Sequence, residues 1–386
     1  MLCRIERAGW LLLPAVLCVS SASAQVTRQG RFWVETVTGS EPAAPSGQLK
    51  VISRGSVTVT GADGDQVHYK LIKKVKARDE ADARRLLDQF VLKASRAGDV
   101  TTLNAAHGSG TAELNIRAPR SLRRTQIDTH GGRVEVADLE GSVETGTGGG
   151  AIRLDRIGGD IVARTAGGEI TLGTVKGRAR CSTAGGAIRA RSIGGELTCE
   201  TAGGEIAIEE AGGPVRASTA GGSIRVARAG AAVTADTAGG SIDVGNASGM
   251  VKASTAGGSI DVGAATSVRC DSAGGGIRLS QVSGSVRAST AVGSVVAQLL
   301  AAGFLDGFLS TSAGDITVFI PSNLAVTIRA QNTAVAQGVR RIVSDFPEIS
   351  VRLDGSLVVG EGSINGGGPL LRLAGSGGTI FIRRQR

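Results

Sequence analysis

The chain has 386 residues, a net charge of +9 from 43 Lys or Arg and 34 Asp or Glu, and only 3% aromatic residues. Nucleic-acid-binding proteins usually set such charge beside aromatic side chains that stack on bases, but this chain has one tyrosine and seven phenylalanines. We therefore expect no nucleic-acid partner. The positive charge suits an anionic polysaccharide or another anionic component of a cell envelope or surface.

Residues 1–24 have the pattern of a secretory signal peptide. Arg4 and Arg7 precede an apolar run from Trp10 to Val19, and Ala22-Ser23-Ala24 offers a cleavage site. The run is shorter than the roughly 18 apolar residues that span a membrane, and no later stretch reaches that length. We expect an exported mature chain without a membrane span, in the periplasm, on the cell surface or secreted.

Residues 25–110 predict an N-terminal β-rich cap that carries one short helix. Alternating apolar residues predict strands at 31–37, 48–53, 56–60 and 66–75. Residues 79–90 predict an amphipathic helix, because apolar side chains recur there at helical spacing. Those side chains are Ala83, Leu86, Leu87 and Phe90. An atypical end segment is expected, since the bare end of a strand stack would pair with other chains.

Residues 111–320 contain a repeat of about 18 residues with the core phrase Thr-Ala-Gly-Gly. A unit this short encloses no core alone and must stack on its neighbours, so the repeat predicts an all-β, single-stranded β-solenoid, or β-helix. Complete copies of the phrase begin at Thr165, Thr183, Thr201, Thr219, Thr237 and Thr255. Weaker copies begin at Thr129, Thr147, Ser272, Thr290 and Ser312.

Numbering each coil from its threonine places apolar residues at positions 6, 8, 11, 15 and 17. This alternation predicts two short strands per coil, each with one face inward. Position 1 continues the inward series, so we expect the threonine to point inward and form hydrogen bonds near a corner. The Gly-Gly pair at positions 3 and 4 predicts corners with positive φ.

The repeat becomes irregular toward its end. One residue is deleted near 265–268, and an apolar insertion follows at 299–310. The insertion predicts a lid over one side of the stack, with a partner-docking loop as the alternative. Residues 321–386 predict further strands, and glycine corners at Gly366 and Gly377 resemble the repeat again. We expect this segment to close the solenoid.

Three cysteines follow the signal peptide, namely Cys181, Cys199 and Cys270. All three occupy inward position 17, which favours small buried thiols over a disulfide framework. Cys181 and Cys199 lie one coil apart, at about 4.8 Å. This distance is compatible with a disulfide, but the Cα–Cβ bonds of the two cysteines would point in parallel directions, which is unfavourable for disulfide geometry. Whether these two residues are bonded stays open.

Outward position 16 forms the candidate binding site. It carries a basic stripe of Lys and Arg with threonines interleaved, and this stripe is a candidate anion-binding or glycan-binding surface. The alternative is a solvated face whose threonines reduce repulsion between like charges. The basic residues are Arg180, Arg216, Lys252, Arg269 and Arg287.

No catalytic, cofactor or metal site is predicted, and we expect the chain not to be an enzyme. Asp243 and Asp261 occupy the same outward position in adjacent coils, near the spacing of a retaining glycosidase pair. Any repeated residue has that spacing, and Arg225 and Arg278 flank the pair. The three histidines show no metal-ligand spacing.

Three motifs resemble those of the bacterial putative-adhesin family. They are Thr-Ala-Gly-Gly-Glu-Ile at Thr165 and Thr201, the segment Gly314–Pro321, and Gly-Gly-Thr-Ile-Phe-Ile at Gly377. The resemblance covers most of residues 30–386 and implies an exported β-solenoid like the head domain of an auto-transporter adhesin. It implies an adhesin or envelope-binding scaffold without catalytic residues. Two alternatives remain: a polysaccharide-acting β-helix enzyme, and an envelope-stress accessory protein without an external ligand.

Overall fold

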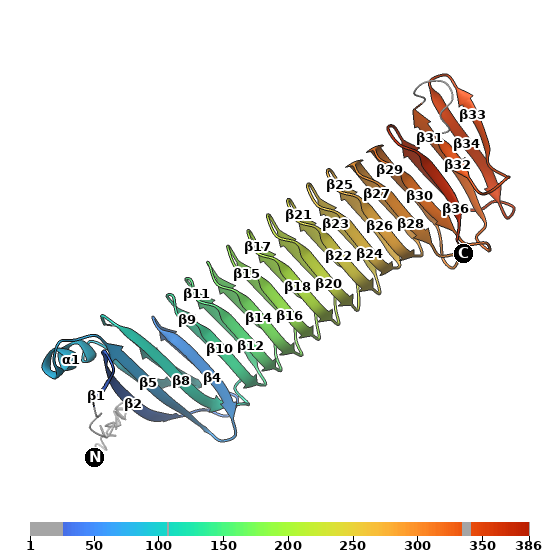
Figure 1. Ribbon diagram of the computed structural model, residues 1–386. Helices are drawn as coiled ribbons and strands as arrows, with labels where there is room; N and C mark the ends of the chain where they lie inside the picture. The colour runs from blue at the N-terminus through green and yellow to red at the C-terminus, as the bar shows by residue number, and fades with distance from the viewer. Residues whose placement is uncertain (1–25, 106–107, 334–340, 386) are drawn as a thin grey trace, which may run out of the picture.

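The computed structural model describes residues 26–105, 108–333 and 341–385, and they form a long rod of stacked coils (Figure 1). The described residues contain 36 strands and one helix. The predicted all-β solenoid with about 18 residues per coil is confirmed, since Thr165 pairs with Thr183 and Ile170 with Ile188. The predicted signal peptide, residues 1–24, lies outside the described residues.

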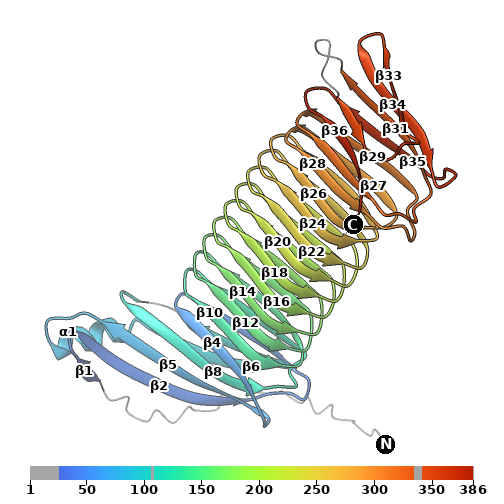
Figure 2. The ribbon, with the colours of Figure 1, turned by 45° about the vertical axis from the view of Figure 1, so that its right-hand side comes forward.

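Each coil contributes one strand to each of two parallel sheets, here called sheet A and sheet B (Figure 2). The coil strands of sheet A are β10 (Val134–Leu139), β12 (Ile152–Ile157), β14 (Ile170–Val175), β16 (Ile188–Ile193), β18 (Ile206–Ala211), β20 (Ile224–Ala229), β22 (Ile242–Ala247), β24 (Ile260–Ala265), β26 (Ile277–Val282), β28 (Val295–Leu299) and β30 (Ile316–Ile320). Those of sheet B are β9 (Arg124–Thr129), β11 (Ser142–Thr147), β13 (Ile161–Thr165), β15 (Ala179–Thr183), β17 (Leu197–Thr201), β19 (Val215–Thr219), β21 (Val233–Thr237), β23 (Met250–Thr255), β25 (Ser267–Ser272), β27 (Ser285–Val292) and β29 (Asp306–Ala313).

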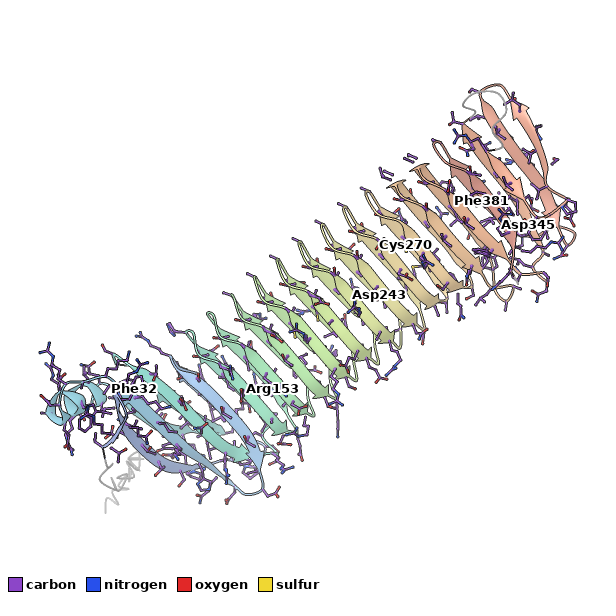
Figure 3. All side chains as sticks on the ribbon, in the orientation of Figure 1. Phe32, Arg153, Asp243, Cys270, Asp345 and Phe381 are labelled. Carbon is purple, nitrogen blue, oxygen red and sulfur yellow. The ribbon has the colours of Figure 1, made fainter. Side chains whose placement is uncertain are left out.

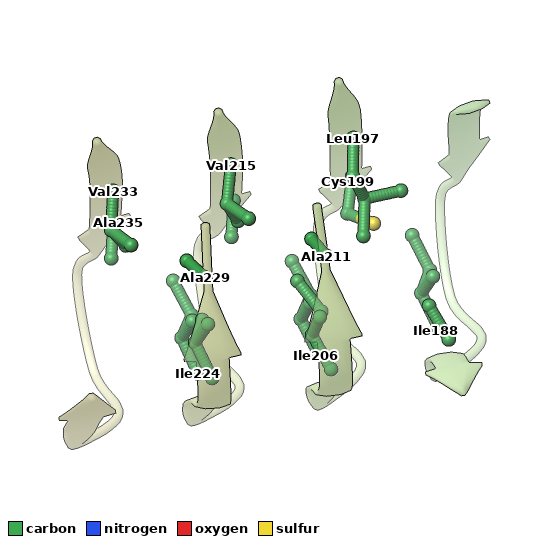
Figure 4. Packing of buried hydrophobic residues seen from close by; sticks show 14 of the residues in the cluster. Ile188, Leu197, Cys199, Ile206, Ala211, Val215, Ile224, Ala229, Val233 and Ala235 are labelled. Atoms are coloured by element: carbon green, nitrogen blue, oxygen red, sulfur yellow. The ribbon is translucent and has the colours of Figure 1, made fainter. Parts of the chain in front are cut away.

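The core is a thin layer between the two sheets. The five inward positions predicted for the coil at Thr165 are all at most 3% exposed, and the same columns continue through the neighbouring coils. Figure 4 shows this layer, with isoleucines from sheet A facing leucine, valine, alanine and cysteine from sheet B. Because each side chain packs on its equivalent one coil away, aliphatic residues of similar size repeat down the rod.

The first threonine of each repeat ties neighbouring coils together at a corner. Thr201 is 8% exposed, as predicted for an inward position. Its Oγ1 donates a hydrogen bond to the carbonyl oxygen of Gly186 in the preceding coil, at 2.9 Å, and accepts one from the Gly204 amide at 3.2 Å. The last repeat begins at Thr311 rather than at Ser312. Thr311 pairs with Thr290, because the insertion adds three residues to the coil.

The reason for the glycine pair differs from the one expected. Neither Gly203 nor Gly204 has a positive φ. A Cβ atom at Gly204 would lie 2.0 Å from the carbonyl oxygen of Gly186, whereas one at Gly203 would meet nothing closer than 3.6 Å. The second glycine is therefore required by the close approach of adjacent coils, and the first is not.

The N-terminal end interleaves strands from different parts of the chain. The strands β3 (Gln48–Ser53) and β4 (Ser56–Ala62), both at predicted positions, form a coil that stacks on β9 and β10. On its other side lies the coil of β7 and β8. The remaining strands extend both sheets in antiparallel fashion. The other strands of this end are β1 (Thr27–Gln29), β2 (Phe32–Pro42), β5 (Gln66–Val75), β6 (Leu92–Ala97), β7 (Val100–Ala105) and β8 (Thr111–Pro119).

The predicted helix is α1 (Glu80–Leu87), which covers the inner face of this end. Asp79 caps it by accepting a hydrogen bond from the Asp82 amide. Beneath the helix, Lys73 donates to Glu35 at 2.7 Å, with the two side chains 8% and 14% exposed. Among the described residues, no helix has the length and apolarity needed to cross a membrane.

The C-terminal end also interleaves its strands. The coil of β35 (Leu370–Gly375) and β36 (Ile380–Arg384) stacks directly on β29 and β30, as the glycine corners suggested. Outside it lie β31 (Val326–Thr333), β32 (Ile342–Ser344), β33 (Ser350–Asp354) and β34 (Leu357–Ile364). Of the insertion at 299–310, Phe304 and Leu309 are buried, whereas Leu305 is 65% exposed.

Candidate binding surfaces

The predicted basic stripe lies in one outward column of sheet B. Adjacent strands place its members side by side with the intervening threonines: Arg180 pairs with Thr198, Arg216 with Thr234, and Lys252 with Arg269. Arg269 in turn pairs with Arg287. The structure therefore brings the predicted residues together as a column. Their role in binding stays a prediction.

Carboxylates beside the stripe reduce its positive field. Three of its arginines form ion pairs across its edges: Arg216 with Glu196 at 3.8 Å, Arg269 with Asp271 at 3.5 Å, and Arg287 with Asp306 at 3.8 Å. Exposed pairs of this kind contribute only about 0–1 kcal/mol each, so an incoming anion could displace them. Arg180 and Lys252 have no ion-pair partner among the described residues.

The pair Asp243 and Asp261 lies on the outer face of sheet A, where Figure 3 labels Asp243. Arg225 lies 3.4 Å from Asp243, and Arg278 lies 3.7 Å from Asp261. Partial burial raises the pKa of Asp261, Arg278 opposes that shift, and Asp243 adds to it. A carboxyl with a raised pKa beside a second carboxyl resembles the catalytic pair of glycosidases, but here each has an arginine partner.

The three cysteines are free and buried, which settles the open question of a bond between Cys181 and Cys199 in this structure. These two residues pair directly across β15 and β17. The hydrogen bond with Cys181, followed by burial, raises the pKa of the Cys199 thiol, and burial raises that of Cys270. Burial keeps all three thiols from reagents, and the raised pKa makes Cys199 and Cys270 poor nucleophiles.

Histidine, cysteine and carboxylate side chains do not converge on a metal site in the part of the chain that the structure describes, where no group of three or more could hold an ion. His68 and His130 lie among the described residues, and His107 lies outside them.

A hollow of about 820 Å³ opens on the outer face of sheet A near the C-terminal end. Sequence reasoning did not identify it. Two half-buried phenylalanines form part of its wall, at outward positions where the regular coils carry small or polar residues. The sequence signal that could have revealed the site is the appearance of phenylalanine at outward positions that carry no aromatic residue in the regular coils. We call this site the C-terminal hollow; it is lined by Gln298, Thr317, Phe319, Asp345, Phe381, Arg383, Arg384 and Gln385.

An ion pair and one cation–π contact join residues that line the C-terminal hollow, and a second cation–π contact links its Arg384 to a ring outside the lining. The Arg383 guanidinium lies 5.0 Å from the centre of the Phe381 ring and donates to Asp345 at 2.8 Å. The Arg384 amide donates to the other oxygen of Asp345 at 3.2 Å. These hydrogen bonds, chiefly that from Arg383, lower the pKa of Asp345. The Arg384 guanidinium lies over the Phe346 ring, at 4.9 Å.

A second hollow, of about 510 Å³, lies near the N-terminal end on β2, β4, β5 and β8. Lys70 and Arg117 line it and are exposed. Tyr69 also lines it but is only 7% exposed, with its ring in the space that a side chain at Gly39 would fill. This hollow therefore offers positive charge without an accessible aromatic ring.

No family model and no curated protein match the chain. Matching solved structures include a "putative cell adhesion protein" from Clostridium sporogenes, 10% identical over 91% of this chain and 100% of that one, with a TM-score of 0.19. A "putative adhesin" from Bacteroides fragilis is 9% identical over 91% and 97%, with a TM-score of 0.21. A "putative lipid binding protein" from Parabacteroides distasonis is 10% identical over 91% and 97%, with a TM-score of 0.20. Two of these proteins bear an adhesin or cell-adhesion description, which the sequence motifs also suggested. At such low identity and TM-score, the matches carry no argument about the ligand.

Proposed function

We propose that this chain is an exported, non-enzymatic β-solenoid that binds a component of a cell envelope or surface, as an adhesin or scaffold. The different roles of inward-facing and outward-facing residues in the coils support this proposal. In the regular coils, inward positions pack the core and outward positions form ladders of small, polar and charged residues. Such a rod holds its two ends far apart and repeats the same surface along its length, which suits a long or repetitive partner. The signal-peptide pattern of residues 1–24 supports export.

An anionic polysaccharide is the partner we propose for the stripe on sheet B. Arg180 and Lys252 are its strongest candidates, because their charges have no carboxylate partner among the described residues. The column places cations in alternate coils from Arg180 to Lys252 and in adjacent coils from Lys252 to Arg287, which suits a partner whose charges also repeat along a chain.

Localisation and binding test this proposal together. We expect cell fractionation to find the mature chain outside the cytoplasm, and the purified mature chain to bind polyuronates with an affinity that falls as salt rises. The double variant Arg180→Ala/Lys252→Ala should bind several-fold more weakly than wild type. A chain retained in the cytoplasm, or one that binds no polysaccharide, lipid or matrix component, would contradict the proposal.

A polysaccharide-cleaving enzyme is the second candidate, and the raised pKa of Asp261 beside Asp243 is the observation that favours it. Turnover of a polyuronate by wild type, abolished by Asp243→Asn with the fold intact, would establish that activity. Without turnover, the two carboxylates serve only as partners for Arg225 and Arg278.

A further inference from the structure

We propose that the C-terminal hollow binds an acidic pyranose, such as a uronate unit of a polysaccharide. This inference rests on the proposed function and assigns its ligand to a different place from the basic stripe. It would make the end of the rod, rather than its length, the part that recognises a particular sugar.

The aromatic floor of the hollow is the first argument. Phe319 on β30 and Phe381 on β36 are diagonal neighbours, because Thr317 pairs with Phe381 and Phe319 pairs with Arg383. Side chains in this relation are within reach of each other on one face of a sheet. The regular coils carry no aromatic residue at the equivalent outward positions. A half-buried ring on the outer face contributes less to folding than a ring in the core, and its exposed part offers an apolar surface to the C–H groups of a pyranose.

The charges of the hollow indicate an acidic sugar rather than a neutral one. Asp345 is engaged with Arg383 and with the Arg384 amide. The Arg384 guanidinium makes no ion pair among the described residues and is held over Phe346. Arg384 therefore lines the hollow without a carboxylate partner and can bind the carboxylate of a ligand, which a guanidinium does through two hydrogen bonds. Gln298 and Thr317 add groups suited to hydroxyls.

Size and shape agree with a sugar from a longer chain. At about 820 Å³, the hollow is within the range of small-molecule sites, and because it is open to solvent it can receive one unit of a longer chain. The rings also distinguish the ligand from a simple anion, because inorganic phosphate would gain nothing from Phe319 or Phe381. The second hollow, near the N-terminal end, has positive charge but no accessible aromatic ring, so it does not combine the two features.

Calorimetric titration of the purified mature chain with short oligogalacturonates tests the inference. Phe381→Ala should weaken binding at least tenfold through loss of the floor. Arg384→Ala should weaken it to a similar degree, but should leave the much weaker binding of a neutral galactose oligomer unchanged. The control variant Arg180→Ala/Lys252→Ala, which alters only the stripe, should keep the affinity for short oligomers within twofold. Inorganic phosphate is the probe for a bare anion site.

The outcomes separate the two proposals. Unchanged binding by Phe381→Ala, with loss in the stripe variant, would overturn this inference and leave the proposed function standing. Phosphate binding as tight as that of the oligomer would also overturn it, since the rings would then contribute nothing. Failure to bind any polyuronate, short or long, would overturn this inference, and together with cytoplasmic retention would overturn both. Unchanged circular dichroism shows that a variant is folded, and Phe381→Leu supplies a milder substitution if Phe381→Ala unfolds.

Discussion

The regular coils and the two ends of the rod are built from different residues. Between positions 91 and 303 the chain contains no Phe, Tyr or Trp, whereas all seven phenylalanines and the described Trp33 and Tyr69 lie in the end regions. In the regular coils, each column accepts only side chains that fit their own copies one coil away. At the ends the columns are interrupted, and larger side chains have room. The repeat therefore accounts for the packing of the rod. Where the repeat is interrupted, at the two ends, the surface carries residues that the regular coils lack.

The two ends also differ from the regular coils in having edge strands that no further coil covers. A bare edge strand would pair with other chains, and here both ends fold antiparallel strands over the last coil. The N-terminal end adds α1 above the buried pair of Lys73 and Glu35. The C-terminal end leaves Val351 and Leu353 on its outermost strand 47% and 69% exposed. The N-terminal end is thus the more completely covered of the two.

Removing the buried Lys73 side chain should have the largest effect on stability and would test whether the N-terminal end unfolds independently of the regular coils. In Lys73→Ala the Glu35 carboxylate stays buried without a partner, which costs about 3–5 kcal/mol. Because coils are coupled mainly to their neighbours, we expect the loss to be local. Hydrogen exchange should show faster exchange within residues 32–105 and unchanged protection near Ile206.

Lys74 offers a matched control. It pairs with Glu113 at the same distance of 2.7 Å, but the two side chains are 34% and 46% exposed. Lys74→Ala should therefore cost no more than about 1 kcal/mol. Equal effects of the two substitutions, or loss of protection throughout the rod after Lys73→Ala, would show that the end and the regular coils form one cooperative unit.

Two adjacent glycines in the regular coils should respond in opposite ways. Gly204→Ala places a Cβ 2.0 Å from the Gly186 carbonyl oxygen and should destabilise the rod by about 1–3 kcal/mol as the coils move apart. Gly203→Ala meets only ordinary contacts and should be neutral or stabilising by up to about 1 kcal/mol.

Urea unfolding followed by circular dichroism measures both glycine variants against wild type. A large loss in Gly203→Ala would mean that its backbone excludes side chains for a reason that the contacts do not show. At the end of the stack the same position already carries Val292, which is 56% exposed, so a side chain is tolerated there. Destabilisation by Gly204→Ala alone would confirm that close approach, not turn conformation, maintains the repeat.

The sequence predicted the repeated part of the fold because every inward position is sampled many times. The inward direction of the Thr201 side chain followed from the alternation, and two hydrogen bonds now explain it. The interleaving of β3 with β7 and β9 was not predictable, since it depends on pairing between distant segments that carry no shared phrase. The C-terminal hollow was missed for a similar reason. Phe319 and Phe381 each occur once, and only their pairing on adjacent strands makes them a site.

Acid should reveal the smallest difference between the end and the regular coils. Hydrogen bonds from Arg383 lower the pKa of Asp345, and bonds from Arg178 lower that of Asp160 in the regular coils. A carboxyl whose pKa is lower in the folded state stabilises fully above its unfolded value, about 3.9, and loses that contribution as the pH falls through the folded value. Both effects therefore lie below about pH 4.

The two sites differ in what surrounds them, and this decides the expected outcome. Next to Asp160, the Ile161 amide donates to the Arg178 carbonyl at 2.8 Å within long ladders on both sides, so it should stay protected at pH 3. At the other site, the amide of Asp345 itself, directly after the three-residue β32, donates to the Ile382 carbonyl oxygen at 2.9 Å and should lose protection. Asp345→Asn should remove this pH dependence. Equal protection of the two amides at pH 3 would show that the C-terminal end is as firmly closed as the coils it terminates.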